Sequence, residues 1–282
     1  MKKNCFTTNN ILWAACCLAA MTVFTGCKDS NGKDSETGIL RPIAEHITGK
    51  WNMEESHRKQ DGKWVEDPIP DGEGHTYTLC TDSTALSAFT APDGYTKLNL
   101  GEWKVDEATG KLTLGTMTVD VLSLDATSLV MGHDEARDSE TGEIMEGEFK
   151  WTFARMDENQ KTLAEKLVGK WILSKSYEKK GGEWVENSNG LPDEGWHLYR
   201  ADATFTAYSR SGEHEFTSDT HWVVNCTTGT VRWTAEDGQS STADVAIEAD
   251  GTLSVFYANS FDPVTGQSVA GEYKDVMVRA QE

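Results

Sequence analysis

The stretch that decides the fold is Ile47–Trp51, ITGKW, because it returns as LVGKW at Leu167–Trp171. Three further stretches return in the same order: Gly62–Glu66 as Gly182–Glu186, the stretch from Gly101 as that from Thr220, and Gly147–Arg155 as Gly271–Arg279. The matching stretches lie 119 to 124 positions apart. Solenoid repeats have periods of about 20–50 residues, so this spacing predicts two copies of one domain.

Alternating apolar and polar residues predict that each copy is built from strands. Phe149, Trp151 and Phe153 alternate with polar or small neighbours, and Asp-Gly pairs separate such runs along the chain. Short alternating runs broken by tight turns are typical of an antiparallel sandwich or barrel. The sequence therefore predicts an all-β fold.

Four connections share an Asx residue followed three positions later by Thr-Gly. They are Asp106–Gly110, Asp138–Gly142, Asn225–Gly229 and Asp262–Gly266. The Asx side chain accepts hydrogen bonds from its own turn and the glycine supplies a positive φ, so the pattern predicts hairpins. Asp138, Glu140 and Glu143 suggest a calcium site as the alternative. The second copy keeps only Asp262 of that set, which favours the hairpin.

Two local features interrupt the strand pattern. Residues 39–47 and 162–168, just before each Gly-Lys-Trp, predict one or two helical turns, the second capped by Thr162. In the first copy the apolar alternation changes parity at Gly101, before Trp103, which predicts a β-bulge.

The N-terminus, residues 1–26, reads as a signal peptide. Lys2 and Lys3 precede the apolar run Ile11–Val23, which is too short to span a bilayer as a stable helix. The run leads to Phe24-Thr25-Gly26-Cys27, which resembles the lipobox of bacterial lipoproteins, where the cysteine receives a diacylglycerol. An ordinary secretory signal with a chance cysteine is the alternative.

Residues 27–38 are small, polar and charged, so they predict a flexible tether behind the lipidated Cys27. Lipoproteins of Bacteroides-type bacteria carry a similar Lys/Asp-rich stretch, which there directs export to the outer face of the outer membrane. The resemblance implies an outer membrane lipoprotein that is exposed at the cell surface rather than facing the periplasm.

The globular part resembles the lipocalin-like domains of the calycin superfamily. In each copy a helical lead-in is followed by Gly-x-Trp, then by strands that end in an arginine. In that superfamily the arginine lies across the tryptophan and closes the barrel, which here implies Trp51 with Arg155 and Trp171 with Arg279. Arg155 has the same parity as Phe153, so it should point inward. Arg279 has the same parity as Tyr273 and Met277 but also as Asp275, so the second copy fits less cleanly.

The resemblance implies two tandem antiparallel up-and-down lipocalin-like β-barrels after the cleaved signal and the tether. The expected boundaries are 39–156 for the first domain, 157–161 for a linker and 162–282 for the second domain. Each copy is shorter than a classical lipocalin and lacks its C-terminal helix. Barrels of eight strands have room for side chains or for one small ligand.

Charge and cysteine content exclude several classes. The formal net charge of −20 disfavours nucleic acid, whose binding needs clustered Lys and Arg, and leaves the Cys27 lipid as the membrane attachment. Cys80 and Cys226 do not occupy matching positions. Two free thiols are favoured over one inter-domain bridge. We expect no metal and no cofactor.

No catalytic motif is present, so we expect no enzyme. His75 and His197 lie near each other in the alignment of the copies, but no further ligand accompanies them, which favours strand or surface histidines. Trp64 and Trp184, beside matching turns, are the candidates for ligand binding, because exposed rings bind apolar molecules or stack on sugars.

Two functions of different classes follow. The first is the capture of a small apolar or amphipathic ligand inside one or both barrels. The second is a structural or recognition role in which barrel surfaces bind proteins or glycans and the interiors are filled. A third, an enzyme, is carried because some barrels of this superfamily bind haem or catalyse reactions. Clustering of His75 with carboxylates in a pocket would favour the enzyme.

Overall fold

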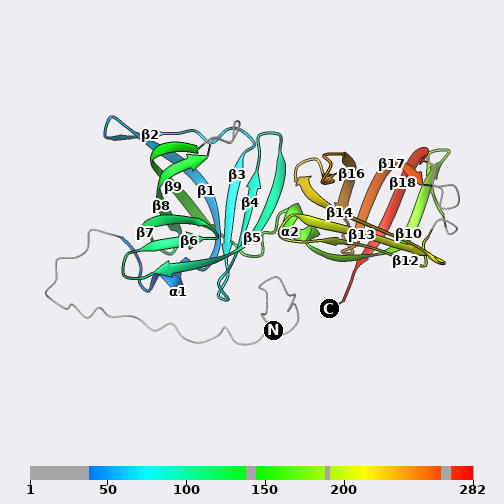
Figure 1. Cartoon of the computed structure of the whole chain (residues 1–282), viewed down its shortest axis with the longest axis horizontal. Helices are drawn as coiled ribbons and strands as arrows, with labels where there is room; N and C mark the ends of the chain where they lie inside the picture. Colours follow the sequence, from blue (N-terminus) through cyan, green and yellow to red (C-terminus); the bar gives the residue numbers. More distant parts are fainter. Residues whose placement is uncertain (1–37, 138–143, 188–190, 262–267, 282) are drawn as a thin grey trace.

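The computed structural model describes residues 38–137, 144–187, 191–261 and 268–281, and these form an all-β structure with two short helices (Figure 1). The elements of the first half are α1 Ile43–Ile47, β1 Gly49–Gln60, β2 Lys63–Glu66, β3 Gly74–Leu79, β4 Thr84–Thr90, β5 Tyr95–Asp106, β6 Lys111–Leu114, β7 Met117–Leu124, β8 Ser128–Arg137 and β9 Ile144–Met156. Those of the second half are α2 Leu163–Leu167, β10 Gly169–Lys180, β11 Glu183–Glu186, β12 Glu194–Tyr199, β13 Thr204–Ser211, β14 His214–Asn225, β15 Thr230–Thr234, β16 Ser240–Ile247, β17 Leu253–Phe261 and β18 Ser268–Arg279.

Pairing between these strands is antiparallel and closes on itself. In the first half successive strands pair from β3 to β9, and β1 pairs with both β3 and β9. In the second half successive strands pair from β12 to β18, and β10 pairs with both ends of that run. The short strands β2 and β11 extend β1 and β10 as hairpins. The predicted class, an all-β closed antiparallel barrel, is confirmed.

The turns and helical lead-ins follow from local chemistry. The backbone amides of Ala108 and Thr227 donate to Asp106 and Asn225 at 2.9 and 3.1 Å, so two of the four predicted Asx turns are present. The other two, with the calcium alternative, lie outside the described residues. Both predicted helical turns form. Thr162 caps α2 through a reciprocal capping box with Glu165.

The predicted bulge at Gly101 is wrong, because the register between β4 and β5 runs past this residue without a shift. The parity change arises because Leu98 faces outward and is buried against the second half, whereas Trp103 faces the interior of the first. Register shifts occur instead at matching places in the first strand of each half, between Met53 and Glu55 and between Leu173 and Lys175.

Each half has its own apolar core. The core of the first half is built around buried Trp51, Trp103 and Phe153, and that of the second around Trp171 and Trp222. The second core continues across the boundary to three outward-facing side chains of β4 and β5, Leu86, Ala88 and Leu98. The base of the second half therefore packs against the outer wall of the first.

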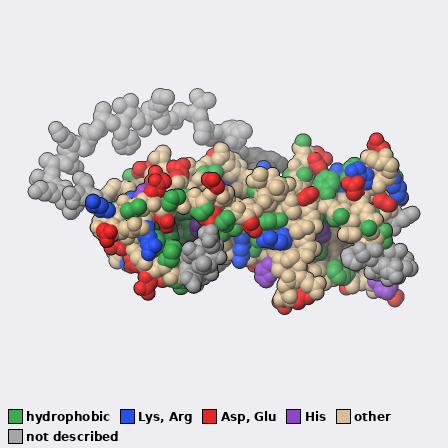
Figure 2. Space-filling model, turned by 90° about the horizontal axis from the view of Figure 1, so that it is seen from above, with side chains coloured by type: hydrophobic (Ala, Val, Ile, Leu, Met, Phe, Trp, Pro, Cys, Tyr) green, Lys and Arg blue, Asp and Glu red, His purple; other side chains and the backbone are tan. Residues whose placement is uncertain are grey.

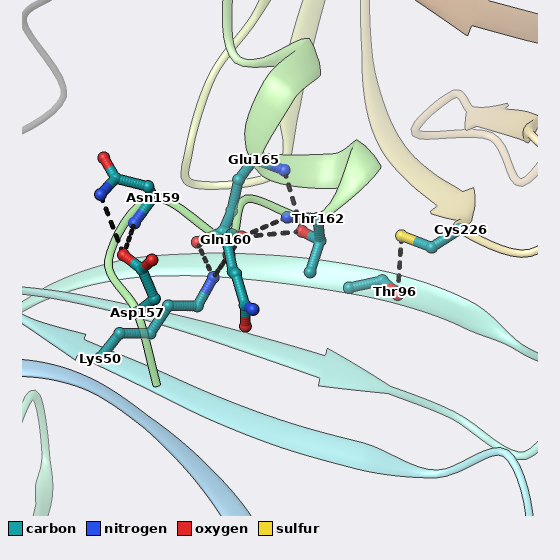
Figure 3. A network of polar contacts seen from close by, with 8 residues as sticks. All are labelled: Lys50, Thr96, Asp157, Asn159, Gln160, Thr162, Glu165 and Cys226. Carbon is teal, nitrogen blue, oxygen red and sulfur yellow. Dashed lines mark hydrogen bonds and ion pairs between the residues drawn. The ribbon is translucent and has the colours of Figure 1, made fainter. Parts of the chain in front are cut away.

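Polar contacts complete this boundary (Figure 3). Lys50, whose side chain is 1% exposed, donates to both carboxylate oxygens of Glu165 at 2.9 and 2.7 Å and to the carbonyl of Gln160 at 2.7 Å. Beside it, β5 pairs with β14 through Thr96 and Val224. A buried ion pair and a strand pairing both hold the two halves together, so the segment 157–161 is not the sole connection between them.

Cys226 carries a free thiol, which lies 3.4 Å from the Thr96 hydroxyl, so it forms no bridge to Cys80. Cys80 is not free, and the prediction of two free thiols is wrong for this residue.

In the described part of the chain, no helix combines the length and the apolar character needed to cross a membrane.

Candidate binding sites

Arg155 lies across the buried ring of Trp51 at the base of the first half. Its Cζ is 4.1 Å from the ring centroid. The guanidinium donates to the carbonyls of His46 and Thr48 at 2.6 and 2.7 Å, and the Trp51 indole donates to the carbonyl of Ile47 at 2.7 Å. Arg155 thus links β9 to His46, in the last turn of α1, and to Thr48, just after it.

The second half repeats this arrangement. The Cζ of Arg279 is 4.2 Å from the Trp171 ring centroid, and its guanidinium donates to the carbonyls of Val168, at 2.7 Å, and Lys166. The Trp171 indole donates to the carbonyl of Leu167 at 2.7 Å. The structure therefore brings together both Trp–Arg pairs that the resemblance implied.

The glycine of each Gly-x-Trp has a steric role. Gly49 and Gly169 have φ values of 125° and 133°, which L side chains rarely adopt, and a Cβ at either would collide with the guanidinium of Arg155 or Arg279. Glycine is required at both positions by the close approach of the arginine.

The interior of the second half holds a continuous group of rings. Phe205 is at its centre, with ring centroids 5.2 Å from His197, 4.7 Å from Tyr199 and 5.5 Å from Trp233. Trp222 adds an edge contact to Tyr199 at 5.1 Å. These rings come from β12 to β15, and they line one side of the closed strand circuit.

Several polar atoms among these rings are buried without a hydrogen-bond partner in the described residues. They are Nδ1 of His197, Oη of Tyr199, Oγ1 of Thr220 and Nε1 of Trp233. The Trp233 indole lies near the Tyr199 hydroxyl, but their geometry is not that of a hydrogen bond. Buried polar groups in native proteins have a protein, water or ligand partner, so this group can accept and donate hydrogen bonds to a molecule in the interior.

The facing side of the same circuit contributes a carboxyl group. Asp275 of β18 lies beside Tyr257 of β17 and Ser176 of β10, whose hydroxyls approach its carboxyl group. Its Oδ1 has no partner among the described residues. The sequence contained a signal for this site, because Asp275 shares parity with the inward-facing Tyr273 and Met277.

Burial sets the ionisation of these groups. Burial raises the pKa of Asp275, an effect that the nearby hydroxyls of Tyr257 and Ser176 oppose. It lowers the pKa of His197 from 6.5 to about 4 and raises the pKa of Tyr199 far above its usual value. At neutral pH the ring group is therefore uncharged, and Asp275 is the acidic group of this interior.

Strand register resolves the alignment of the two histidines. In β3 the partner of Trp51 is Tyr77, whereas in β12 the partner of Trp171 is His197. His197 therefore matches Tyr77, and the two histidines are not equivalent. His75 lies 4.5 Å from the Tyr77 ring, and burial alone lowers its pKa to about 4, with no contribution from a carboxylate.

Trp64 and Trp184 lie on the outside of the hairpins β1–β2 and β10–β11, with 40% and 38% of their surface exposed. Trp64 faces Lys150, which alternates with inward-facing Phe149, and Trp184 faces outward-pointing Phe256. The structure places neither ring among the interior groups of the second half.

Two hollows open on the described surface, and the lining of the second includes Phe205 and Thr220 of the interior ring group. One, of about 470 Å³, is lined by residues that include Glu248, Thr252 and Lys274. The other, of about 290 Å³, is lined by residues that include Arg200 and Asp219. Both are open and lined by polar and apolar atoms together, so neither is an enclosed apolar cup of the kind that would hold a large hydrophobic ligand.

Two further expectations concern the lipid attachment and a metal ion. Cys27, the predicted lipid attachment, lies outside the described residues. Within the described ranges, no cluster of three or more His, Cys, Asp or Glu residues is arranged to hold a metal ion.

The closed antiparallel barrel is compatible with a calycin or lipocalin-like architecture. Neither the models of known protein families nor the curated proteins contain a match to this chain.

Proposed function

We propose that the protein is a lipid-anchored binding protein of the outer membrane, built from two tandem lipocalin-like barrels. Residues 39–156 form the first, 162–282 the second, and 157–161 the segment between them. Two separate pairing circuits, each with its own core and its own Trp–Arg pair, support this division. The diacylglycerol on Cys27 attaches the protein, and the barrels face the cell exterior.

The second barrel captures a small amphipathic molecule. The observation that carries this proposal is the set of unpartnered polar atoms among the rings of His197, Tyr199 and Trp233, with Asp275 on the facing side. Ring faces cover an apolar body, while the hydroxyl, imidazole and carboxyl groups bind its polar end. In the first barrel Tyr77 occupies the place of His197.

A fluorescent amphipathic amine, 1-aminoanthracene, tests the interior. Its emission should rise on binding to the intact chain, and His197→Phe and Asp275→Asn should weaken binding by about tenfold, the value of about 1.4 kcal/mol for a lost hydrogen bond. Tyr77→Phe, at the matching place in the first barrel, is the control and should bind like wild type. Equal binding by all variants would exclude the second interior as the site.

Native mass spectrometry of protein purified from its host tests the same proposal without a chosen probe. A retained small molecule that is lost in Asp275→Asn supports capture.

The anchor has a separate test. Cys27→Ala should leave the protein folded but release it from membranes, and protease treatment of intact cells should cleave the wild-type barrels. Persistent membrane association of Cys27→Ala would contradict the lipid anchor.

Recognition of proteins or glycans through the barrel surfaces is the second candidate function. It is favoured by the open hollow that includes Glu248, Thr252 and Lys274, which lies on the outer face beside β17 and β18. Neither candidate involves an enzymatic step or a cofactor.

A further inference from the structure

Trp64 and Trp184 occupy equivalent hairpins and are the most exposed tryptophans of the described residues. Each belongs to a Trp-Val-Glu strand that extends the first strand of its half. Exposing an indole forfeits the gain of burying it, about 1.5–3 kcal/mol for a large apolar side chain. Its exposure in both copies therefore points to a contact made outside the chain.

The same charged residues frame both rings. In the first half Lys59 and Lys150 lie 5.8 and 5.2 Å from the Trp64 ring centroid, and Lys59 pairs with Glu148 at 2.6 Å. In the second half Lys179 lies 5.7 Å from the Trp184 ring and pairs with Glu272 at 2.9 Å. Each site is thus a partly exposed indole with a lysine ammonium over its ring, and that lysine is paired with a partly exposed carboxylate.

The two sites differ in one neighbour. Phe256 lies 6.0 Å from Trp184 and widens that apolar surface, and Lys274 covers the far side of the phenylalanine at 5.4 Å. Among the described residues, no phenylalanine ring contacts the Trp64 ring. The second site should therefore bind the same ligand more strongly than the first.

Charge selects the class of ligand. Acidic side chains are spread over the surface of both halves (Figure 2), and the net charge of −20 disfavours polyanions and anionic membranes. Lysines beside each ring disfavour cations locally. A neutral sugar fits both conditions, since its C–H face stacks on an indole while its hydroxyls bond to ammonium and carboxylate groups.

The boundary between the halves holds the two sites in a fixed relation. The buried Lys50–Glu165 pair and the pairing of β5 with β14 resist rotation of one half against the other. In Figure 1, β2 and β10 lie toward opposite ends of the long axis of the molecule. Two sites at opposite ends can bind separate units of one long polymer, but not one short oligosaccharide.

We propose that Trp64 and Trp184 form two equivalent carbohydrate-stacking sites that bind a single neutral polysaccharide chain at two points. The sites lie on the outer hairpin faces, so they operate independently of the interior of the second barrel. Binding at two points gains affinity over either site alone by a factor on the order of 100 or more.

Affinity gel electrophoresis of the full chain, with neutral glucan, mannan or xylan in the gel, tests the proposal. At least one polymer should retard the wild type. Trp64→Ala and Trp184→Ala should each weaken retardation by about tenfold or more, with the larger loss for Trp184→Ala, and the double variant should run as in a plain gel.

Phe216→Ala is the matched control, because Phe216 is 61% exposed and lies on β14, which pairs with neither hairpin. It should be retarded like wild type. Since all three residues are exposed, melting temperatures should be unchanged in every variant.

Short oligosaccharides supply a second readout. Titration calorimetry with tetrasaccharides of the retarding polymer should give two sites in wild type and one in each single variant. Failure of all three polymers to retard the wild type would overturn the proposal, and so would equal retardation of the double variant. Binding to anionic polysaccharide or to phosphatidylglycerol vesicles instead would also overturn it.

Discussion

The buried ion pair between the two halves offers the sharpest test of how the tandem is held together. Replacing Lys50 by methionine keeps most of the side-chain volume but removes the ammonium that bonds to both Glu165 oxygens and to the Gln160 carbonyl. Glu165 would remain with its side chain 7% exposed and without its cation.

The size of the effect follows from that burial. Removing one partner of a buried pair costs about 3–5 kcal/mol, because an uncompensated charge is left in a medium of low polarity. Exposed pairs are worth about 0–1 kcal/mol. Lys50→Met should therefore lower the free energy of unfolding by about 3–5 kcal/mol, measured by urea unfolding with tryptophan fluorescence and by calorimetry.

The chain supplies a matched control at the same place in the second half. Lys170 sits on the outside of β10, where its Nζ lies 4.3 Å from the centroid of the Trp196 ring. A cation–π contact at an exposed site contributes about 0.5–1 kcal/mol, so Lys170→Met should cost no more than about 1 kcal/mol. Equal losses for the two variants would refute the assignment of the boundary to the buried pair.

The mode of unfolding gives a further readout. With Lys50→Met the two halves should separate into two calorimetric transitions, and limited proteolysis should cut faster within residues 157–161. A single transition with an unchanged cleavage rate would show that the β5–β14 pairing and the apolar contacts suffice to couple the halves.

Three other predictions concern the base and interior of each half. Trp51→Ala should destabilise the first half by about 3–5 kcal/mol, as for other large-to-small changes at buried tryptophans, and leave membrane attachment intact; an unchanged melting profile would contradict its structural role. Gly169→Ala should lower the melting temperature, because the new methyl group meets the Arg279 guanidinium at a φ of 133°, and Gly74→Ala, at a residue without a positive φ and with only an ordinary contact to Thr90 at 3.8 Å, is the control. Finally, the free energy of unfolding should fall as the pH drops from about 6.5 to about 4, because the histidines of the unfolded chain bind protons in this range while buried His75 and His197 do not until about pH 4. Replacing both histidines by phenylalanine should flatten this part of the curve of melting temperature against pH. A curve with the wild-type slope would refute the assignment.

Much of the local structure could be read from the chain because it depends on neighbouring residues. Alternation in β9 predicted which residues face inward, the Asx-x-x-Thr-Gly turns placed hairpins at Gly110 and Gly229, and Thr162 marked the start of α2. Both stacked Trp–Arg pairs were implied by the resemblance to lipocalin-like domains, which the duplicated Gly-x-Trp and the final arginines carry.

The tertiary structure was required for the contacts between distant segments that the resemblance did not imply. The change of parity after Leu98 indicated a bulge because the sequence alone assigns every apolar residue of the strand to one core. Leu98 is instead buried on the outer face of β5, where the second half packs against it. His197 lay near His75 in the alignment of the two copies, whose local register was ambiguous by two residues, and strand pairing matches it with Tyr77. Nothing in the sequence distinguishes Lys50 from a surface lysine, because its burial depends on its contact with Glu165, 115 positions away. Side-chain alternation and turn chemistry depend on a few neighbouring residues, so they can be predicted from the sequence. Burial and charge pairing between the halves depend on which surfaces meet in the folded chain, so they require the tertiary structure.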